Sequence, residues 1–304
     1  MSSSLAEAAT IRAATADDAE AVAAVSRARE EAVRGESAMN VGDVRGWWRT
    51  TDIERNTWVV ELGNEIVGAA TLWSHGDGPN SWGEVHPAHR GRGFGSALLE
   101  RIEARARDLG ASVVRTDAFA ADEHALRLLA SRGYRDVRHY YEMQIELGED
   151  PPPEPEWPEG IVVHPFRLED AREFHAANME AFADELGFVP TPFEEWREAR
   201  LGAEDFDPSL WAVARDGDAI AGFVRCEPMR YGAPWVGALG VLAPWRRRGL
   251  GLALLRHAFH LFHARGERAV GLGVDTENPT GATRLYERAG MHVVRRNDTW
   301  ELGA

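Results

Sequence analysis

Hydrophobic and polar residues alternate along this chain in a pattern that predicts the same order of strands and helices twice. In the second half, short apolar or alternating runs predict strands near 161–165, 211–215, 220–227, 236–242 and 269–274. Apolar residues three and four apart predict helices near 169–185, 192–200, from a glycine turn to about 264, and 280–289, before two closing strands. The first half predicts a helix from Asp17 and strands near 10–13, 59, 67 and 113–116. This order predicts an α/β (α+β) fold in each half, a mixed, mostly antiparallel, twisted sheet flanked by helices.

A proline-rich segment separates the two halves. It runs from Gly148 to Gly160 and contains five prolines without any apolar period. Such a segment cannot form a helix or a central strand, and it favours an extended, semi-rigid spacer. We therefore expect an N-terminal domain at residues 1–147, a linker at 148–160 and a C-terminal domain at 161–304.

The halves also repeat an arginine- and glycine-rich motif at a constant offset of 156 residues. The matching residues are Arg90, Gly93 and Gly95 in the first half and Arg246, Gly249 and Gly251 in the second. A later motif keeps an offset of 157, from Gly133 to Gly290 for example. Agreement across both motifs predicts a tandem duplication of one domain.

Composition narrows the class of protein. The 304 residues include 34 basic residues, all of them arginine, and 49 acidic ones, for a formal net charge of -15. A generic nucleic-acid binder is usually basic, so we expect no nucleic-acid partner. No apolar run approaches the length of a membrane span, and no secretion signal is evident. With a single cysteine, Cys226, we expect a soluble cytoplasmic protein that is a monomer or homodimer.

The repeated motif has a direct chemical interpretation. Glycines let a ligand approach the backbone, and amide groups at a helix N-terminus bind anions, as do arginine side chains. A pyrophosphate is the natural ligand. The candidate binding residues are Arg90, Gly91, Arg92, Gly93, Phe94 and Gly95, and Arg246, Arg247, Arg248, Gly249, Leu250 and Gly251.

A turn of this sequence after the fourth strand resembles the GNAT superfamily of N-acetyltransferases, over residues 10–146 and 161–302. The resemblance implies that the turn binds the pyrophosphate of acetyl-CoA. It also implies that the preceding strand binds the pantetheine arm through its backbone, here Gly83, Glu84 and Val85, and Leu239, Gly240 and Val241. Asn278 is then expected close to the thioester.

The second half also contains Asn278 and Tyr286 in a segment similar to the family pattern Asn-x-x-x-Ala-x-x-Leu-Tyr-x-x-x-Gly-Phe. A phenol beside the thioester can protonate the departing thiolate, so Tyr286 is the candidate general acid. In the first half Ala121 and Leu129 stand at the corresponding positions, and neither can donate a proton in this way. We therefore expect the N-terminal domain to be catalytically weak or silent, even if it binds acetyl-CoA.

Our first candidate for the general base is Glu227, and Asp275 and Glu277 are the alternatives. Tandem members of the superfamily include mycothiol synthases, whose base resembles a glutamate early in the strand before the turn. Trp235 stands at that position here and cannot accept a proton.

Taken together, these features predict an acetyl-CoA-dependent N-acetyltransferase acting on a primary amine of a small molecule. A mycothiol-synthase-like enzyme and an antibiotic-modifying acetyltransferase are the alternatives within that class, and a non-catalytic CoA-binding sensor or structural protein is the alternative outside it. We expect no metal: the histidines at 257, 260 and 263 lie on one apolar helix without a carboxylate and are interpreted as a partly solvated face.

Overall fold

In a computed structural model the chain forms two compact units. The structure describes residues 9–37, 39–49, 51–75, 78–183, 188–203, 205–230, 233–278 and 281–303. We call Met1–His139 with Asn297–Ala304 unit 1, and Tyr140–Arg296 unit 2. Among the described residues, no helix is both long and apolar enough to cross a membrane.

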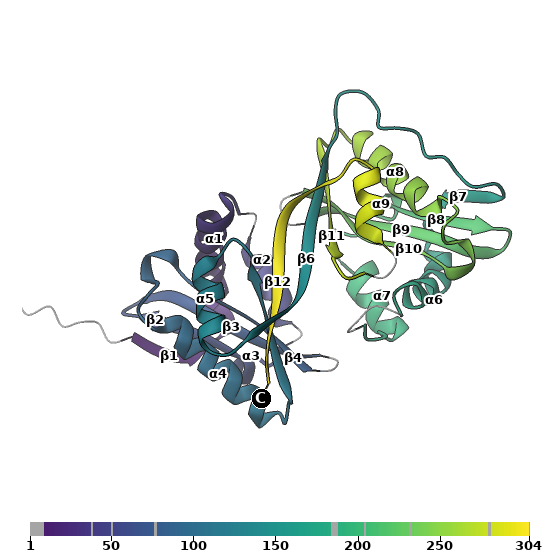
Figure 1. The fold of residues 1–304 in the computed structure, drawn as a ribbon. Coiled ribbons are helices and arrows are strands. Elements are labelled where there is room, and N and C mark those ends of the chain that lie inside the picture. The colour runs from purple at the N-terminus through teal and green to yellow at the C-terminus, as the bar shows by residue number, and fades with distance from the viewer. Residues whose placement is uncertain are drawn as a thin grey trace, which may run out of the picture. The chain divides into compact units, whose positions relative to one another are not determined.

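Unit 1 contains a sheet in the order β1-β2-β3-β4-β5-β12 (Figure 1). Its strands are β1 (Ala9–Ala13), β2 (Thr57–Leu62), β3 (Glu65–His75), β4 (Gly78–Val85), β5 (Val113–Phe119) and the end of β12 (His292–Gly303). All neighbours pair antiparallel except β4 and β5, which are parallel. Its helices are α1 (Ala19–Arg34), α2 (Val41–Trp48), α3 (Ile53–Asn56), α4 (Phe94–Asp108) and α5 (Glu123–Ser131).

Unit 2 repeats this arrangement in the order β7-β8-β9-β10-β11-β6. Its strands are β7 (Ile161–Pro165), β8 (Trp211–Asp216), β9 (Ala219–Arg230), β10 (Ala233–Val241), β11 (Ala269–Asp275) and most of β6 (Arg135–Glu146). Here the parallel pair is β10 with β11. Its helices are α6 (Ala171–Phe182), α7 (Phe193–Leu201), α8 (Leu250–His263) and α9 (Ala282–Arg288). The mixed, mostly antiparallel sheet predicted for each half is confirmed.

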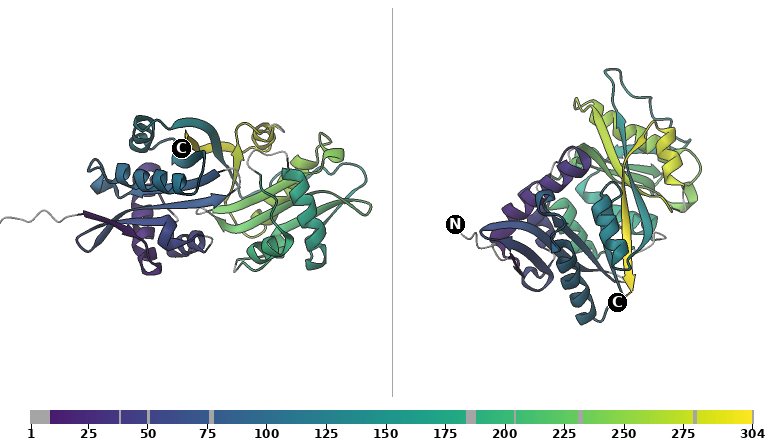
Figure 2. Two further views of the ribbon diagram at one scale, coloured as in Figure 1. Left: turned by 90° about the horizontal axis from the view of Figure 1, so that it is seen from below. Right: turned by 60° about the vertical axis from the view of Figure 1, so that its left-hand side comes forward.

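Helices cover both faces of each sheet (Figure 2). In unit 1, Val60 and Ala70 pack with α4 on one face, and their neighbours Val59 and Ala69 pack with α1 on the other. This alternation follows from the period of two along a strand, and it explains why both faces of the central strands are apolar.

The end of the second half differs from the sequence prediction. Two closing strands were expected after residue 289, but the structure has the single strand β12, because no glycine or proline interrupts 292–302. The expected helix end at 184–185 and helix start at Thr280 lie outside the described residues.

The two long strands β6 and β12 connect the units. From Tyr140 onward β6 pairs antiparallel with β11 of unit 2, whereas from Asn297 onward β12 pairs antiparallel with β5 of unit 1. Each sheet is therefore completed by the closing strand of the other sequence half. The duplicated sequence can be divided at the linker, but the compact units are composed differently.

The linker lies along α8 within unit 2. His263 Nε2 is 3.1 Å from the carbonyl oxygen of Glu149, and His260 Nε2 is 3.3 Å from that of Pro153. The ring of His257 packs edge-on against Trp157 at a centroid distance of 5.7 Å. The three histidines thus bind the linker, which the interpretation as a partly solvated face did not anticipate.

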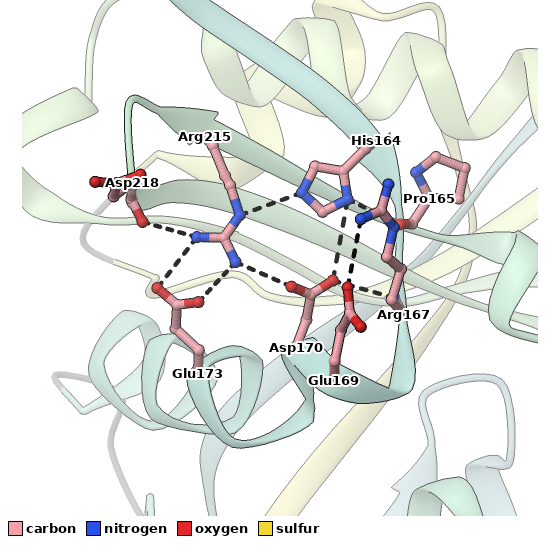
Figure 3. Close-up of polar contacts among 8 residues, drawn as sticks. All are labelled: His164, Pro165, Arg167, Glu169, Asp170, Glu173, Arg215 and Asp218. Atoms are coloured by element: carbon pink, nitrogen blue, oxygen red, sulfur yellow. Dashed lines mark hydrogen bonds and ion pairs between the residues drawn. The ribbon is translucent and has the colours of Figure 1, made fainter.

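An arginine network ties the first helix of unit 2 to its edge strands (Figure 3). Arg215 on β8 donates to Glu173 and Asp170 at 2.6 and 3.0 Å, and to His164 Nε2 on β7 at 3.2 Å. In unit 1 the arginine is on the other strand of the pair, since Arg12 on β1 binds Asp18 and Glu61. In both networks an arginine of an edge strand binds an aspartate at the start of the first helix, Asp18 in unit 1 and Asp170 in unit 2.

Candidate functional site

The two glycine turns have the same backbone geometry. In each unit a strand (β4 or β10) leads through one 3-10 turn (Pro87–His89 or Ala243–Trp245) into the helix α4 or α8. The glycine before each helix is left-handed, with φ of 87° at Gly93 and 89° at Gly249. The first helical bond of α8 runs from Ala253 N to Gly249 O, so the preceding amides are directed out of the helix end. This geometry is typical of turns that bind anions at a helix N-terminus.

The arginines of the two turns have different partners. Arg246 Nε donates to the carbonyl of Val241 at 3.0 Å, and Arg248 lies 3.5 Å from the carbonyl of Glu159 in the linker. In unit 1, Arg90 Nη2 donates to the buried carboxylate of Asp122 at 3.0 Å. The first arginine of the motif therefore binds a carboxylate in unit 1, whereas in the described part of unit 2 it binds a backbone carbonyl.

The parallel strands separate next to each turn. The β4–β5 ladder contains the pairs Asn80–Arg115 and Ser81–Thr116 and then stops, before Gly83, Glu84 and Val85. In unit 2 the β10–β11 ladder contains the pairs Trp235–Gly271 and Val236–Leu272, before Leu239, Gly240 and Val241. A bulge at Gly237 adds to this divergence. The backbone of the predicted pantetheine strands is thus left unpaired on one side.

In unit 1 the divergent strands open into a cavity of about 400 Å³. Its walls come from α1, β4, β5, α4, α5 and the turn. Among the residues predicted from sequence it is lined by Gly83, Glu84, Val85, Arg90, Gly91, Gly93, Phe94 and Gly95. Arg92 is not part of the lining; its guanidinium lies over the ring of Phe94. The structure therefore brings nearly all of the predicted first-half site together around one cavity.

In unit 2 the predicted catalytic residues follow β11. Tyr286 lies on α9, is 9% exposed and packs in the core of the unit. Asn278 is half-buried in the turn after β11, and its backbone amide donates to the carbonyl of Asp275. On the same helix, Leu285 contacts the position at which Gly251 would carry a Cβ, 3.2 Å away. The turn and the helix carrying Tyr286 are therefore in direct contact.

Glu227 on β9 is held by arginines. Arg225 donates to its carboxylate and to the carbonyl of Gly237, the latter at 3.0 Å, and Arg230 Nη1 lies 3.4 Å away. Burial raises the pKa of Glu227, but the charges of Arg225 and Arg230 outweigh it, so the pKa is lowered overall. Glu227 is thus a stable carboxylate and a weak base.

Trp235 occupies the space above β11. Its indole ring covers Gly271, where a Cβ would lie 2.6 Å from a ring carbon. Only glycine allows the ring to lie this close to the strand, next to the point where β10 and β11 diverge.

Comparison with known proteins decides the family. A family model described as the acetyltransferase (GNAT) family matches residues 22–134 and 168–291, more than half of the chain. The chain belongs to the GNAT family of acetyltransferases. It is similar to the mycothiol acetyltransferase of Thermomonospora curvata, with 35% identity over 232 residues covering 74% of this chain and 75% of that protein.

Solved structures of GNAT proteins share the tandem fold. A GCN5-related N-acetyltransferase from Sphaerobacter thermophilus is 35% identical, with a TM-score of 0.83 over 97% of this chain and 95% of that one. A tandem GNAT protein from the clavulanic acid biosynthesis pathway is 18% identical, with a TM-score of 0.75 over 97% and 98%. The predicted tandem GNAT architecture and N-acetyltransferase class are therefore confirmed, and membership of the GNAT family implies acetyl-CoA as the acyl donor.

Two ion pairs next to the predicted site residues were not predicted from the sequence. One is the ion pair of Arg225 with Glu227, and the other is the pair of Arg29 with Asp122, at 3.2 Å. The Arg29–Asp122 pair could have been suspected from the repeat, because the first half has Asp122 at the position where the second half has Pro279.

Other titratable groups lie outside the cavity lining. Burial raises the pKa of the Cys226 thiol, so it is protonated and unreactive. Asp136, His139 and Asp298 place their ligand atoms within 4.8 Å of one another in unit 1, where His139 Nδ1 is 2.9 Å from Asp298.

Proposed function

We propose that this GNAT protein transfers the acetyl group of acetyl-CoA to a primary amine of a small molecule, and that the transfer takes place in unit 2. The observation that carries this proposal is the packing of the Tyr286 helix against the glycine turn, with Asn278 after the adjoining strand. In unit 1 the equivalent of Tyr286 is Leu129, a buried residue without a proton to donate.

The proposed reaction needs two proton movements. The neutral amine attacks the acetyl carbon, the carbon–sulfur bond breaks, and Tyr286 donates its phenolic proton to the CoA thiolate. The amine nitrogen gives up its own proton. Glu227 is our first candidate to accept it, directly or through water, with Asp275 and Glu277 as alternatives. Because Glu227 has a lowered pKa, it fits a transient acceptor better than a strong base.

The acceptor is the finer part of this proposal. The relative from Thermomonospora curvata and one from Clavibacter sepedonicus, 34% identical, are both named mycothiol acetyltransferase. A mycothiol-type amine is therefore the first acceptor to test, followed by amine antibiotics. We place the reaction in the cytoplasm.

For unit 1 we propose binding of acetyl-CoA without turnover. The intact turn and the cavity of about 400 Å³ support binding, and Leu129 in place of a tyrosine supports the absence of transfer. This is the one respect in which a non-catalytic CoA-binding role fits the chain.

Replacing Tyr286 by phenylalanine tests the assignment of the acid. Tyr286→Phe keeps the ring in the core but removes the proton donor, so kcat for amine-dependent CoA release is expected to fall by about 100-fold or more. Leu129→Tyr added to this variant is expected to restore nothing. Thiol release with a panel of amines, followed colorimetrically, measures both.

The matched control is Tyr134→Phe, which removes another buried phenol at the position equivalent to Met291. It is expected to keep the parent rate. A Tyr286→Phe protein with the parent kcat would contradict the assignment, and tight acetyl-CoA binding without turnover of any amine would favour the non-catalytic role for the whole chain.

A further inference from the structure

A buried network of charged and polar side chains lies against the cavity of unit 1. Glu84 on β4 is 4% exposed and contacts Ser26 Oγ on α1 through Oε1. One turn along the same helix, Arg29 donates to Asp122 at 3.2 Å, and Arg90 of the glycine turn donates to the same carboxylate oxygen at 3.0 Å. Of these residues, all but Ser26 line the cavity.

Among the described residues, the Glu84 side chain has one hydrogen-bond donor, Ser26, and that donor has a second acceptor on its own helix. The Ser26 hydroxyl contacts both Glu84 Oε1 and, at 3.1 Å, the carbonyl oxygen of Val22. A hydroxyl has one proton, so Ser26, which donates to Glu84 Oε1, shares that proton with the Val22 carbonyl and gives an ionised Glu84 only part of a hydrogen bond. The other oxygen, Glu84 Oε2, is buried without a hydrogen-bond partner, which a neutral acid tolerates better than a carboxylate.

The electrostatics of the site also favour the neutral acid. Burial raises the pKa of Glu84 to about 8, against the opposing effects of Arg29 and the Ser26 hydrogen bond, and Glu30 on α1 adds to the rise. On β5, burial also raises the pKa of Asp117, against its hydrogen bond with Thr299. The remaining titratable groups of the lining are His89 before the turn and His124 on α5.

The state of Glu84 sets the charge of the cavity wall at the turn. With Glu84 neutral, the cations Arg29 and Arg90 face the single anion Asp122, which leaves one positive charge in excess among these residues. Ionised Glu84 would cancel that excess through its coupling to Arg29. An anionic ligand bound at the turn therefore favours the protonated form.

The sequence of unit 2 differs at the positions that match this network. The positions that match Glu84 and Asp122 are Gly240 and Pro279, and neither side chain can carry a charge. The two turns therefore share their left-handed glycine but differ on the preceding strand, where unit 1 has a carboxyl group at Glu84 and unit 2 has Gly240.

We propose that unit 1 binds the pyrophosphate group of a CoA ester with uptake of a proton, and that Glu84 is the group that takes it up. This inference rests on the proposed CoA binding by unit 1 and is independent of acetyl transfer in unit 2. It makes occupancy of the first site depend on pH, whereas the second site lacks the linked group.

Calorimetry on the full-length chain tests the proposal. Gly251→Asp places a carboxylate at the helix end of unit 2 and is used to block that site, so that acetyl-CoA titrations report unit 1. Between pH 7.5 and 9.5, where the phosphates of the ligand stay ionised, binding is expected to weaken by about five-fold or more. Titrations near pH 8.5 in two buffers of different ionisation enthalpy are expected to show proton uptake.

Two further variants identify the group. Glu84→Gln imitates the neutral acid and is expected to bind equally well at both pH values without proton uptake. Asp117→Asn, which removes the other cavity carboxyl of raised pKa, is expected to keep the uptake. Uptake that survives in Glu84→Gln, or disappears in Asp117→Asn, overturns the assignment to Glu84. Binding without uptake overturns the linkage alone. No binding to the blocked chain overturns CoA binding by unit 1 as well, while amine-dependent acetylation by the parent chain still tests unit 2 separately.

Discussion

One pair of facing residues on neighbouring strands has its large member on opposite strands in the two units. In unit 1, Glu84 on β4 pairs with the small Ala69 on β3. In unit 2 the same pair is Gly240 on β10 with the large Phe223 on β9. Phe223 is fully buried and packs on Phe174 of α6 at a centroid distance of 4.7 Å. The carboxyl group of unit 1 thus occupies the place that an aromatic ring fills in unit 2.

This exchange predicts that Gly240 tolerates no side chain. A Cβ there would lie 2.4 Å from the Phe223 ring and 2.9 Å from Ala181 Cβ, so Gly240→Ala is expected to lower the free energy of unfolding by about 1–3 kcal/mol. Urea unfolding of the full chain measures the loss. Adding Phe223→Leu is expected to recover part of it.

Gly83→Ala serves as the control for Gly240→Ala. Gly83 also lies on the strand before a glycine turn, but its nearest neighbour would be Ala70 Cβ at 3.6 Å, an ordinary contact. If Gly83→Ala costs as much as Gly240→Ala, close packing by Phe223 is not the reason.

At the scale of elements, the linker is an ordered strap on α8. Besides the histidine contacts, Arg256 binds Glu156 at 3.0 Å and Arg268 donates to the carbonyl of Gly148 at 3.2 Å. Surface ion pairs contribute little individually. The repeated pattern of donors facing linker carbonyls is therefore what holds the segment in place.

Removing two donors is expected to release the strap. A His260→Ala/His263→Ala chain loses the bonds to Pro153 and Glu149, so a glutamate-specific protease is expected to cut between 148 and 160 several-fold faster. Mass spectrometry of limited digests locates the cuts. His124→Ala, an exposed histidine on α5, is the control, and equal cleavage in both variants would show that the histidines do not hold the linker.

The elements also show which features a sequence can reveal. Strands, helices and the glycine turns were predicted because their signals are local: alternating apolar residues, and Gly93 or Gly249 directly before a helix. The histidine contacts were not, because residues 149 and 263 are far apart in the chain and a carbonyl acceptor has no sequence signature. The same applies to the partners of Glu84, because Ser26, Arg29 and Glu30 lie on α1, far from β4 in the chain.

At the scale of the molecule, the last strand of each sequence half, β6 or β12, completes the sheet that contains most of the other half. Unit 2 needs β6 from the first sequence half to pair with β11, from Ala269–Glu146 to Asp275–Tyr140. A fragment that begins after the linker lacks this strand and leaves the edge of β11 unpaired. Exposed edges of this kind promote association with other chains.

Two fragments of similar length are therefore expected to differ in stability, because only one of them contains the β6 residues that pair with β11. The fragment 140–296 contains every strand of unit 2, whereas 161–304 corresponds to the second half of the duplicated sequence. We expect 140–296 to unfold cooperatively and to stay monomeric, and 161–304 to unfold at lower denaturant or to associate. Circular dichroism in urea and size-exclusion chromatography distinguish these outcomes. Adding a peptide of residues 135–147 to 161–304 is expected to stabilise it, because the peptide supplies β6. If 161–304 alone is the more stable fragment, the closing strand is dispensable and the sequence halves, rather than the compact units, are the folding units of this protein.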